Sequence, residues 1–561
     1  MKSIPRAGVG LTLCSLALLH ARAEAVEYVT NSGTLLRQNP VLTGPGARSG
    51  TSSPTIDPAP APLPEAAPGE LAFVVNDVQL TGDATDAERA RIADVVAPIR
   101  GHRITFARLQ ALRGEINLAL FRFADAPVSV RLPPQSITDG VVRLEVLHGR
   151  IEDVRVENAS NVSNRVLEDL FARRRTLRQI RRGVRLAQRL PGVGAVQALM
   201  SEGRENGGTL VTVQVAPGDT LAGGVVVDNA GSTGAGKVRV GLAGSFENPF
   251  GQGDRLDALA YLTPGGLQSG DGVGETRLGR IGYETSFAQG RARVGAAYSQ
   301  VGYRLGGAFE GLGKGDARVG SLYAVAPALH AGGSDLDVGA TIERRRLDDR
   351  RFGDLLESRR ESDALALTLN GDVSGALQAH RMAVRYTGEV RKGQIRREEI
   401  DRTTQDVLAQ DGKRDFLVVR LSADVLKAVT PNVVLSARGR GQWSGEALDA
   451  SERAALGGPD AVRAYDQNAA AVDSGGVVSL GASYHLPRAR GTTIDLFYDY
   501  GRGTVRALGD SASERASLHG AGVGLAWQRN GFAAQISYAR PTGASTATAH
   551  GQTWFTVRKS F

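Results

Sequence analysis

The feature that most constrains this chain is an alternation of apolar and polar residues that recurs from Thr220 to Phe561. The alternating segments are about ten residues long and are separated by turn-rich stretches, as in outer-membrane β-barrels. In segment 417–425, apolar residues occupy every odd position, while arginine, serine and aspartate occur among the even ones. A soluble sandwich also alternates, but here the polar face carries charges and many glycines. The pattern therefore predicts a transmembrane β-barrel with a water-filled lumen over residues 218–561.

We expect about sixteen antiparallel strands, an even number as in bacterial barrels. Loops after odd-numbered strands should lie outside the cell and be long, as at 304–316, 391–412, 446–473 and 501–513. The last strand ends on the aromatic residue Phe561, which resembles a sorting signal for barrel assembly. The predicted strand centres are Val226, Val240, Leu259, Ile281, Ala296, Tyr323, Gly339, Leu367, Val384, Val419, Leu435, Leu480, Leu496, Val523, Ile536 and Val557.

Residues 1–23 have the features of a signal peptide. Lys2 and Arg6 precede a short apolar core, and Ala21-Arg22-Ala23 is a small-x-small cleavage site. The core is too short to span a bilayer, and no later run of about 20 apolar residues exists, which argues against a helical membrane protein. The only cysteine, Cys14, lies inside this peptide, so we expect no disulfide and no thiolate metal site in the mature chain.

Two further segments precede the first folded region. Residues 24–40 include a mostly polar stretch, 26–38, that can form a short helix or remain an unordered N-terminus. Residues 41–70 are rich in proline and small residues, which predicts an extended linker. The chain has a net charge of +8, but its basic residues are interspersed with acidic ones, so we expect no binding of nucleic acid.

Residues 71–150 and 151–217 are predicted to form two small α+β modules. Each combines strand-like alternation with apolar residues at helical spacing. A small open sheet leaves edge strands to which an extended chain can add through backbone hydrogen bonds; a passive spacer is the alternative. The helical positions are Phe106, Leu109, Leu112, Ile116 and Leu120 in the first module, and Leu177, Ile180, Val184 and Ala187 in the second.

The candidate site is the loop 456–465, which includes Arg463. Arg463 lies roughly ten residues before the next strand, a reach of some 30 Å, so the loop can fold into the lumen. Asp499 alternates with the lipid-facing residues Tyr498 and Tyr500 and is expected to point inward. The two residues could then form a bidentate ion pair; a solvated arginine and an ordinary lumen aspartate are the alternative. His485 and the scattered serines form no catalytic set, and we expect no enzyme activity, cofactor or metal.

Several motifs together resemble those of TpsB transporters, the outer-membrane half of two-partner secretion systems. This family belongs to the POTRA-plus-barrel superfamily that includes BamA. Segment 462–465, Val-Arg-Ala-Tyr, resembles the loop motif Val-Arg-Gly-Tyr/Phe, and segment 497–501 resembles its Phe-x-Asp-x-Gly partner. Segments 228–231 and 248–254 resemble the first barrel hairpins. The residues that carry these resemblances are Val462, Arg463, Tyr465, Phe497, Asp499 and Gly501, and, for the end of a POTRA module, Pro133, Pro134, Gln135, Gly140 and Gly149.

The resemblance implies a sixteen-stranded barrel, two POTRA modules and an N-terminal helix, residues 24–40, that plugs the pore. It implies a monomeric outer-membrane pore whose periplasmic modules recognise a large unfolded exoprotein of the TpsA type and secrete it to the cell surface. Outer-membrane lipid, the barrel-assembly machinery and periplasmic chaperones are the other implied partners. An assembly insertase and a passive porin remain alternatives. The cargo could be a haemolysin, an adhesin, a contact-dependent toxin or a haem-binding protein. At Ala464 the motif commonly has glycine, and we expect the methyl group to restrict this turn.

Overall fold

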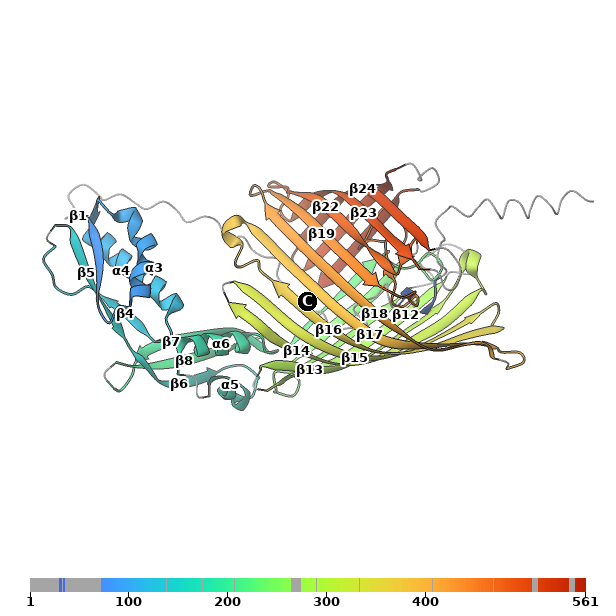
Figure 1. Ribbon diagram of the computed structural model, residues 1–561, viewed down its shortest axis with the longest axis horizontal. Helices are drawn as coiled ribbons and strands as arrows, with labels where there is room; N and C mark the ends of the chain where they lie inside the picture. The colour runs from blue at the N-terminus through green and yellow to red at the C-terminus, as the bar shows by residue number, and fades with distance from the viewer. Residues whose placement is uncertain are drawn as a thin grey trace, which may run out of the picture.

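The computed structural model places two α+β modules in front of a closed β-barrel (Figure 1). The predicted signal peptide, the linker and most of segment 24–40 lie outside the described residues. The structure describes residues 30–32, 34–35, 72–137, 139–172, 175–205, 207–263, 274–288, 290–331, 333–405, 407–467, 469–506, 513–543 and 550–561.

The first module packs two helices on small sheets, and its core includes the fully buried Leu112 and Ile116. Thr85 forms a capping box with Glu88 that starts the first helix. The prediction that Phe106 belongs to the apolar face was wrong, because this first helical residue is 55% exposed. The elements are β1 (Ala72–Val75) paired with β3 (His102–Thr105), the sheet β2 (Asp77–Gly82), β5 (Val141–His148), β4 (Val128–Arg131), and the helices α3 (Asp86–Val96) and α4 (Phe106–Phe123).

The second module repeats the plan with a three-stranded sheet in the order β6-β8-β7. Sequence periodicity missed its first helix, which has only 8 residues. That helix nevertheless buries Leu167 and Leu170 completely in the core. The elements are β6 (Arg150–Asn158), α5 (Asn164–Phe171), α6 (Leu177–Gln188), β7 (Val193–Glu202) and β8 (Gly208–Pro217).

Sixteen antiparallel strands form the barrel, which closes between β26 and β9. Each predicted strand centre lies in a different strand, so the predicted architecture is confirmed. Large apolar residues cover the outer surface; Leu322 and Ile342, for example, are 62% and 64% exposed. The strands are β9 (Leu221–Asp228), β10 (Arg239–Glu247), β11 (Arg255–Leu262), β12 (Glu275–Phe287), β13 (Ala292–Arg304), β14 (Gly313–Ala331), β15 (Ser334–Arg351), β16 (Leu356–Asp372), β17 (Met382–Asp401), β18 (Val407–Ala428), β19 (Val433–Ser444), β22 (Ser474–His485), β23 (Thr492–Val505), β24 (Glu514–Arg529), β25 (Phe532–Pro541) and β26 (Gln552–Ser560).

The prediction that residues 391–412 form an outer loop was wrong, because most of this segment continues strands β17 and β18. These strands have 20 and 22 residues, more than the 9–11 or so that cross a bilayer. Their outer ends therefore project beyond the apolar band, where Gln394 and Arg396 can face water. The loop 304–316 is shorter than predicted for the same reason, since β14 starts at Gly313. Within the described residues, no helix has the length and apolar character needed to cross a membrane.

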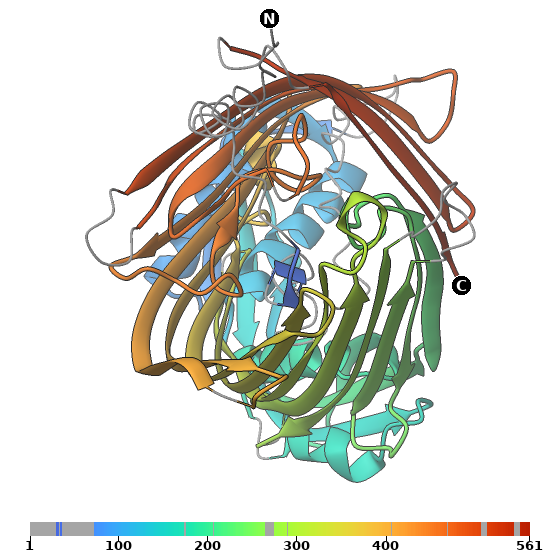
Figure 2. The same ribbon diagram turned by 90° about the vertical axis from the view of Figure 1, so that its right-hand side faces the viewer.

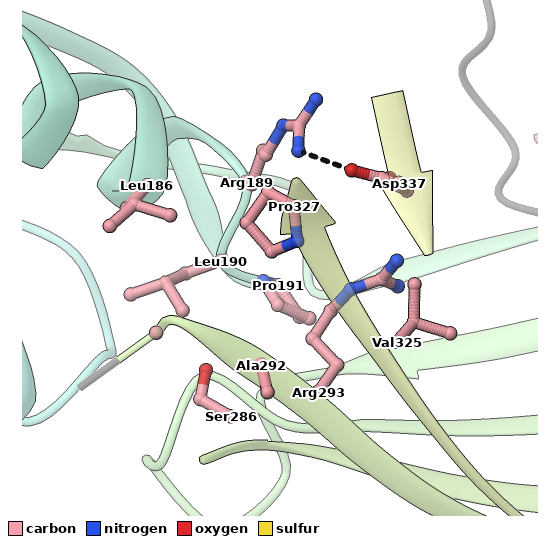
Figure 3. Close-up of a pocket in the computed structure, with 11 residues that line it drawn as sticks. Leu186, Arg189, Leu190, Pro191, Ser286, Ala292, Arg293, Val325, Pro327 and Asp337 are labelled. Carbon is pink, nitrogen blue, oxygen red and sulfur yellow. Dashed lines mark hydrogen bonds and ion pairs between the residues drawn. The ribbon is translucent and has the colours of Figure 1, made fainter. Parts of the chain in front are cut away.

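The second module contacts the barrel at the end where the connections after even-numbered strands lie. Arg189 donates to Asp337 on β15 at 3.2 Å, and Leu186 and Leu190 line the same junction (Figure 3). On another connection, the Ser163 amide donates to the Gly251 carbonyl at 2.9 Å. These contacts identify the end of the barrel that faces the modules.

Candidate functional site

The connection between β19 and β22, residues 445–473, folds back into the barrel and is here called the inward loop. Inside it, β20 (Ala454–Ala455) pairs with β21 (Ala471–Val472). Leu456 and Val462 are completely buried and form an apolar cluster with the wall residues Val477 and Leu518. Figure 2 shows the loop inside the ring of strands, where it occupies part of the lumen.

At the tip of the inward loop, Arg463 contacts Asp499 on β23. The guanidinium donates to the carboxylate through Nε at 2.8 Å and Nη2 at 2.6 Å, and the Arg463 amide donates to the same group at 3.1 Å. Asp499 has no exposed side-chain surface. A buried carboxylate held by a bidentate cation and a backbone donor fixes both position and orientation. We call these two residues, with Ser479, the tip latch.

Three of the residues around Arg463 were not predicted by the loop spacing or were assigned only through the family motif. The Ser479 hydroxyl donates to Asp499 at 2.7 Å and accepts from Arg463 at 2.8 Å. Trp554 donates through Nε1 to the Arg463 carbonyl at 2.7 Å. The Phe497 ring centroid lies 3.3 Å from the Arg463 guanidinium carbon, within cation–π range. Three strands, β22, β23 and β26, therefore meet at one arginine, and their shared register cannot be deduced from any single segment.

The remaining motif residues shape the loop around the latch. A side chain at Gly501 would bring its Cβ within 2.9 Å of Val462, so glycine makes room for the buried valine. Tyr465 accepts at its carbonyl from the Gly458 amide at 3.1 Å, which closes the tip. The φ of Ala464 is not positive, so the turn accommodates an alanine where the motif commonly has glycine, and its methyl group packs against Gly520.

The start of the inward loop is held by a second, larger charge cluster that the sequence analysis missed. Glu452 accepts from Arg345 at 2.8 Å, from Arg391 at 3.0 Å and from Arg420 at 2.8 Å. Glu343 pairs with two of these arginines and is itself buried. Burial would raise the pKa of Glu452, but the three arginines lower it well below its usual value. We call these five residues the root cluster.

A short N-terminal segment, the described residues 30–32 and 34–35, also lies inside the lumen (dark blue in Figure 2). Residues 32, 34 and 35 are helical, and the Leu35 amide donates to the Asn31 carbonyl at 3.0 Å. Ser32 is fully buried and donates to Asp349 on β15 through its amide at 2.9 Å and its hydroxyl at 2.8 Å. Leu35 packs into an apolar cluster of the barrel wall with Leu347.

The POTRA motif residues lie in the first module, far along the chain from the lumen site. Gln135 bridges to Arg143 on β5, accepting from its amide at 2.8 Å and donating to its carbonyl at 2.6 Å. Gly140 has a φ of +71°, and a Cβ there would lie 2.7 Å from a backbone oxygen. Pro133 and Pro134 precede this turn, and the Gly149 amide donates to the Pro127 carbonyl at 2.8 Å. These residues shape a turn of the module.

Phe561 follows the last strand at the barrel seam. Its backbone exchanges two hydrogen bonds of 3.0 Å with Gly223, while its side chain is 66% exposed.

The described residues contain no group of three or more metal-ligating side chains. At the lumen site, ion pairs and hydrogen bonds hold a loop and an N-terminal segment against the wall.

Comparison with known proteins gives a consistent result over most of the chain. Residues 207–527 match the family described as haemolysin secretion/activation protein ShlB/FhaC/HecB, and residues 73–149 match the ShlB-type POTRA domain. The heme/hemopexin transporter protein HuxB of Haemophilus influenzae (strain 86-028NP) is 24% identical over 518 residues, which cover 88% of each chain.

Two solved structures resemble the fold. CdiB from Escherichia coli has a TM-score of 0.61 and 20% identity, with 98% of each chain covered. BamA from Haemophilus ducreyi, lacking POTRA domains 1–3, has a TM-score of 0.55 and 13% identity, with coverage of 87% of this chain and 100% of that chain. The shared architecture extends from the periplasmic modules to the barrel.

Proposed function

The chain belongs to the ShlB/FhaC/HecB family of haemolysin secretion/activation proteins, and from that premise we propose how its pore is held closed and how it captures cargo. The protein is an outer-membrane transporter of two-partner secretion, with its POTRA modules in the periplasm and a TpsA-type exoprotein as cargo. It acts as a monomer in outer-membrane lipid, and it depends on periplasmic chaperones and the barrel-assembly machinery for its own insertion. Its role includes no catalytic step.

The pore is closed at rest by the inward loop together with residues 24–40, which act as a plug helix. The observation that carries this proposal is the burial of Ser32 against Asp349 inside the lumen. A polar residue held there by two hydrogen bonds blocks the path of an exported chain. The plug leaves the lumen before the cargo passes, and folding of the cargo outside the cell drives export.

Cargo capture uses the edge strands of the modules. Strand β7 pairs only with β8 in the sheet order β6-β8-β7, so its other edge is open to an extended chain. Leu199 and Met200 on β7 are 49% and 40% exposed. An unfolded exoprotein can add a strand there through backbone hydrogen bonds, with its apolar side chains covering these two residues.

The first test is secretion of the cognate TpsA-type exoprotein, sought among the genes beside this one, in a Gram-negative host. Intact protein, Arg463→Ala and an empty vector are compared by blotting medium and periplasm. We expect export with intact protein and a strong loss with Arg463→Ala. Equal export by both would remove the tip latch from the mechanism. Disturbance of many outer-membrane proteins on loss of the transporter, with the exoprotein unaffected, would favour an assembly insertase.

The plug is tested by planar-bilayer conductance of the purified protein with and without residues 24–40. Deletion is expected to raise the conductance and to leave the barrel folded. Folding is judged by the electrophoretic mobility of an unheated sample in a denaturing gel. An unchanged conductance would overturn the plug. A higher conductance in a protein that exports no exoprotein would favour a passive porin.

Charge reversal tests whether Arg463 and Asp499 act as a direct pair. Arg463→Asp and Asp499→Arg should each reduce export, and the double variant should recover part of it, because the opposite charges again face each other. A double variant as inactive as the single variants would count against direct pairing.

A further inference from the structure

One arginine of the barrel wall contacts both elements that occupy the lumen. Arg360 on β16 has a side chain that is only 7% exposed. Through Nη1 it donates to Asp449 of the inward loop at 3.2 and 3.0 Å. Through Nη2 it donates to the Ser32 hydroxyl of the N-terminal segment at 3.1 Å, and also to Asp349. The two ends of a single guanidinium thus hold two segments that lie more than 400 positions apart in the chain.

The partners of Arg360 are themselves fixed by further contacts. Asp349 accepts from the Tyr303 hydroxyl at 2.7 Å as well as from Ser32. Asp449 accepts from the Ser451 amide at 2.9 Å and from its hydroxyl at 2.8 Å. The group therefore contains two carboxylates and one guanidinium in a water-poor part of the lumen.

We infer that Arg360 couples the N-terminal segment to the inward loop, so that release of either one weakens the attachment of the other. This inference rests on the proposed plug and adds to it: the plug and the loop are released as a unit rather than independently. Arg360 is a positioning residue in this scheme, since it holds the gating elements and does not need to touch the cargo.

Electrostatics explains why the two attachments depend on each other. When Ser32 leaves, water reaches Asp349 and Arg360, and the higher local dielectric weakens the pair between Arg360 and Asp449. When Asp449 leaves, Arg360 is likewise hydrated, and the buried contacts of Ser32 lose their protection. Such a coupling is reciprocal, because the same free energy links both equilibria.

A second meeting point supports the inference. The connection between β9 and β10 contacts both elements at neighbouring residues. Ser232 shares a hydrogen bond of 2.5 Å with Thr30 of the N-terminal segment. Thr233 donates to Asp466 of the inward loop at 2.8 Å, and Gln467 donates to the Ala230 carbonyl at 2.7 Å. Movement of this connection would disturb both attachments together.

The experiment uses two single-cysteine reporters in the full-length, membrane-inserted protein, each with Cys14→Ser. Leu35→Cys reports on the N-terminal segment, and Ala470→Cys reports on the inward loop; the native residues are 3% and 5% exposed. The rate of labelling by a membrane-impermeant maleimide measures how often each site is exposed. Each rate is compared with that of the same reporter without a second change.

We expect two cross-effects. Asp449→Asn, a change in the loop, should speed labelling at position 35, and deletion of residues 24–40, which removes Ser32, should speed labelling at position 470. Each increase should be at least about fivefold, the lower end of typical coupling between sites. In an Arg360→Gln background, Asp449→Asn should change labelling at position 35 by less than about twofold, because the shared contact is already gone.

The control is Asp460→Asn, which changes an exposed carboxylate of the same loop and should alter neither rate. Unchanged labelling at position 35 in Asp449→Asn would overturn the inference. An equally large effect of Asp449→Asn with and without Arg360 would also overturn it. If deletion of residues 24–40 raises conductance but these cross-effects are absent, the plug stands and the coupling fails; if conductance stays unchanged, the plug itself fails.

Discussion

The two charged attachments of the inward loop are built in different ways. At the tip latch, the loop supplies the cation, Arg463, and the wall supplies one carboxylate, Asp499. In the root cluster, the loop supplies the anion, Glu452, and three wall arginines surround it. The tip arginine keeps 20% of its side chain exposed, whereas Glu452 keeps 2%.

This difference suggests different roles. A buried anion among several cations is costly to remove, because each arginine then loses one of its carboxylate partners in a water-poor site. A partly exposed bidentate pair is easier to break, since water can replace part of its hydrogen bonding. We expect the root cluster to anchor the loop and the tip latch to be the end that moves.

The largest effect should come from Glu452→Gln. The amide keeps the size of the side chain but leaves Arg345, Arg391 and Arg420 without their shared charge, at a cost of about 3–5 kcal/mol in loop docking. Labelling of Ala470→Cys should rise by two orders of magnitude or more, since about 1.4 kcal/mol is tenfold.

Asp460→Asn is the matched control for Glu452→Gln, because it changes an exposed carboxylate of the same loop. In the Asp460→Asn variant, the Ala470→Cys reporter should be labelled at the same rate as without that change. If Glu452→Gln labelled no faster than this control, the root cluster would not be the anchor.

Arg463→Lys should have the next largest effect. Lysine keeps the charge but cannot donate in parallel to both carboxylate oxygens or stack as a plane on Phe497. A loss of about 1.5–3 kcal/mol follows from hydrogen bonds to a charged group, and exoprotein export should fall about tenfold or more. Arg440→Lys, at a neighbouring lumen arginine that donates to the Asp460 carbonyl in the tip, serves as the control. Equal export by Arg463→Lys and the native protein would mean that charge alone suffices.

Much of the fold could be predicted because its strongest signal is local. Alternation along each strand assigns one face to lipid, so the sixteen strand centres followed from the sequence. The lengths of β17 and β18 did not, because their outer ends project into water and carry polar residues on both faces. The helix α5 was missed because its apolar residues span only two turns.

The tip latch and the root cluster also differ in how far the sequence could predict them. The reach of the loop and the alternation around Asp499 allowed Arg463 and Asp499 to meet in the lumen, and the resemblance of segments 462–465 and 497–501 to the TpsB motifs selected this pair. The root cluster combines four residues of strands β15, β17 and β18 with Glu452 of the loop. The sequence shows a run of arginine at 344–346, and another at 359–360 where Arg360 lies, without saying which of them pair. The available signal was the alternation of side chains along each strand. Ile342 and Leu365 face lipid, so Arg345 and Arg360, each an odd number of positions away on the same strand, must face inward.

A smaller effect is expected from Ser479→Ala, which removes the hydroxyl that joins Arg463 to Asp499. The bidentate pair itself remains, so the loss should be about 1 kcal/mol, that of one hydrogen bond. Export should fall by about fivefold at most. A loss as large as that of Arg463→Lys would mean that the serine, rather than the arginine fork, fixes the tip. Ser483→Ala, on the same strand and bonded to Asp495, provides the control.

The smallest effect should be that of mild acid on the root cluster. The pKa of Glu452 is lower in the folded protein than its ordinary value of 4.5, so its ionised form is the one that folding favours. The stabilisation from this group is therefore complete above the ordinary pKa and is lost only as the pH falls through the lowered value. Planar-bilayer conductance of the native protein should stay equally low at about pH 7 and about pH 5. The variant lacking residues 24–40, measured at the same two pH values, shows how much of any change comes from the open pore itself. Opening between these two values would show that the loop is held by a group that titrates near neutrality, and the root cluster could not then be its main anchor.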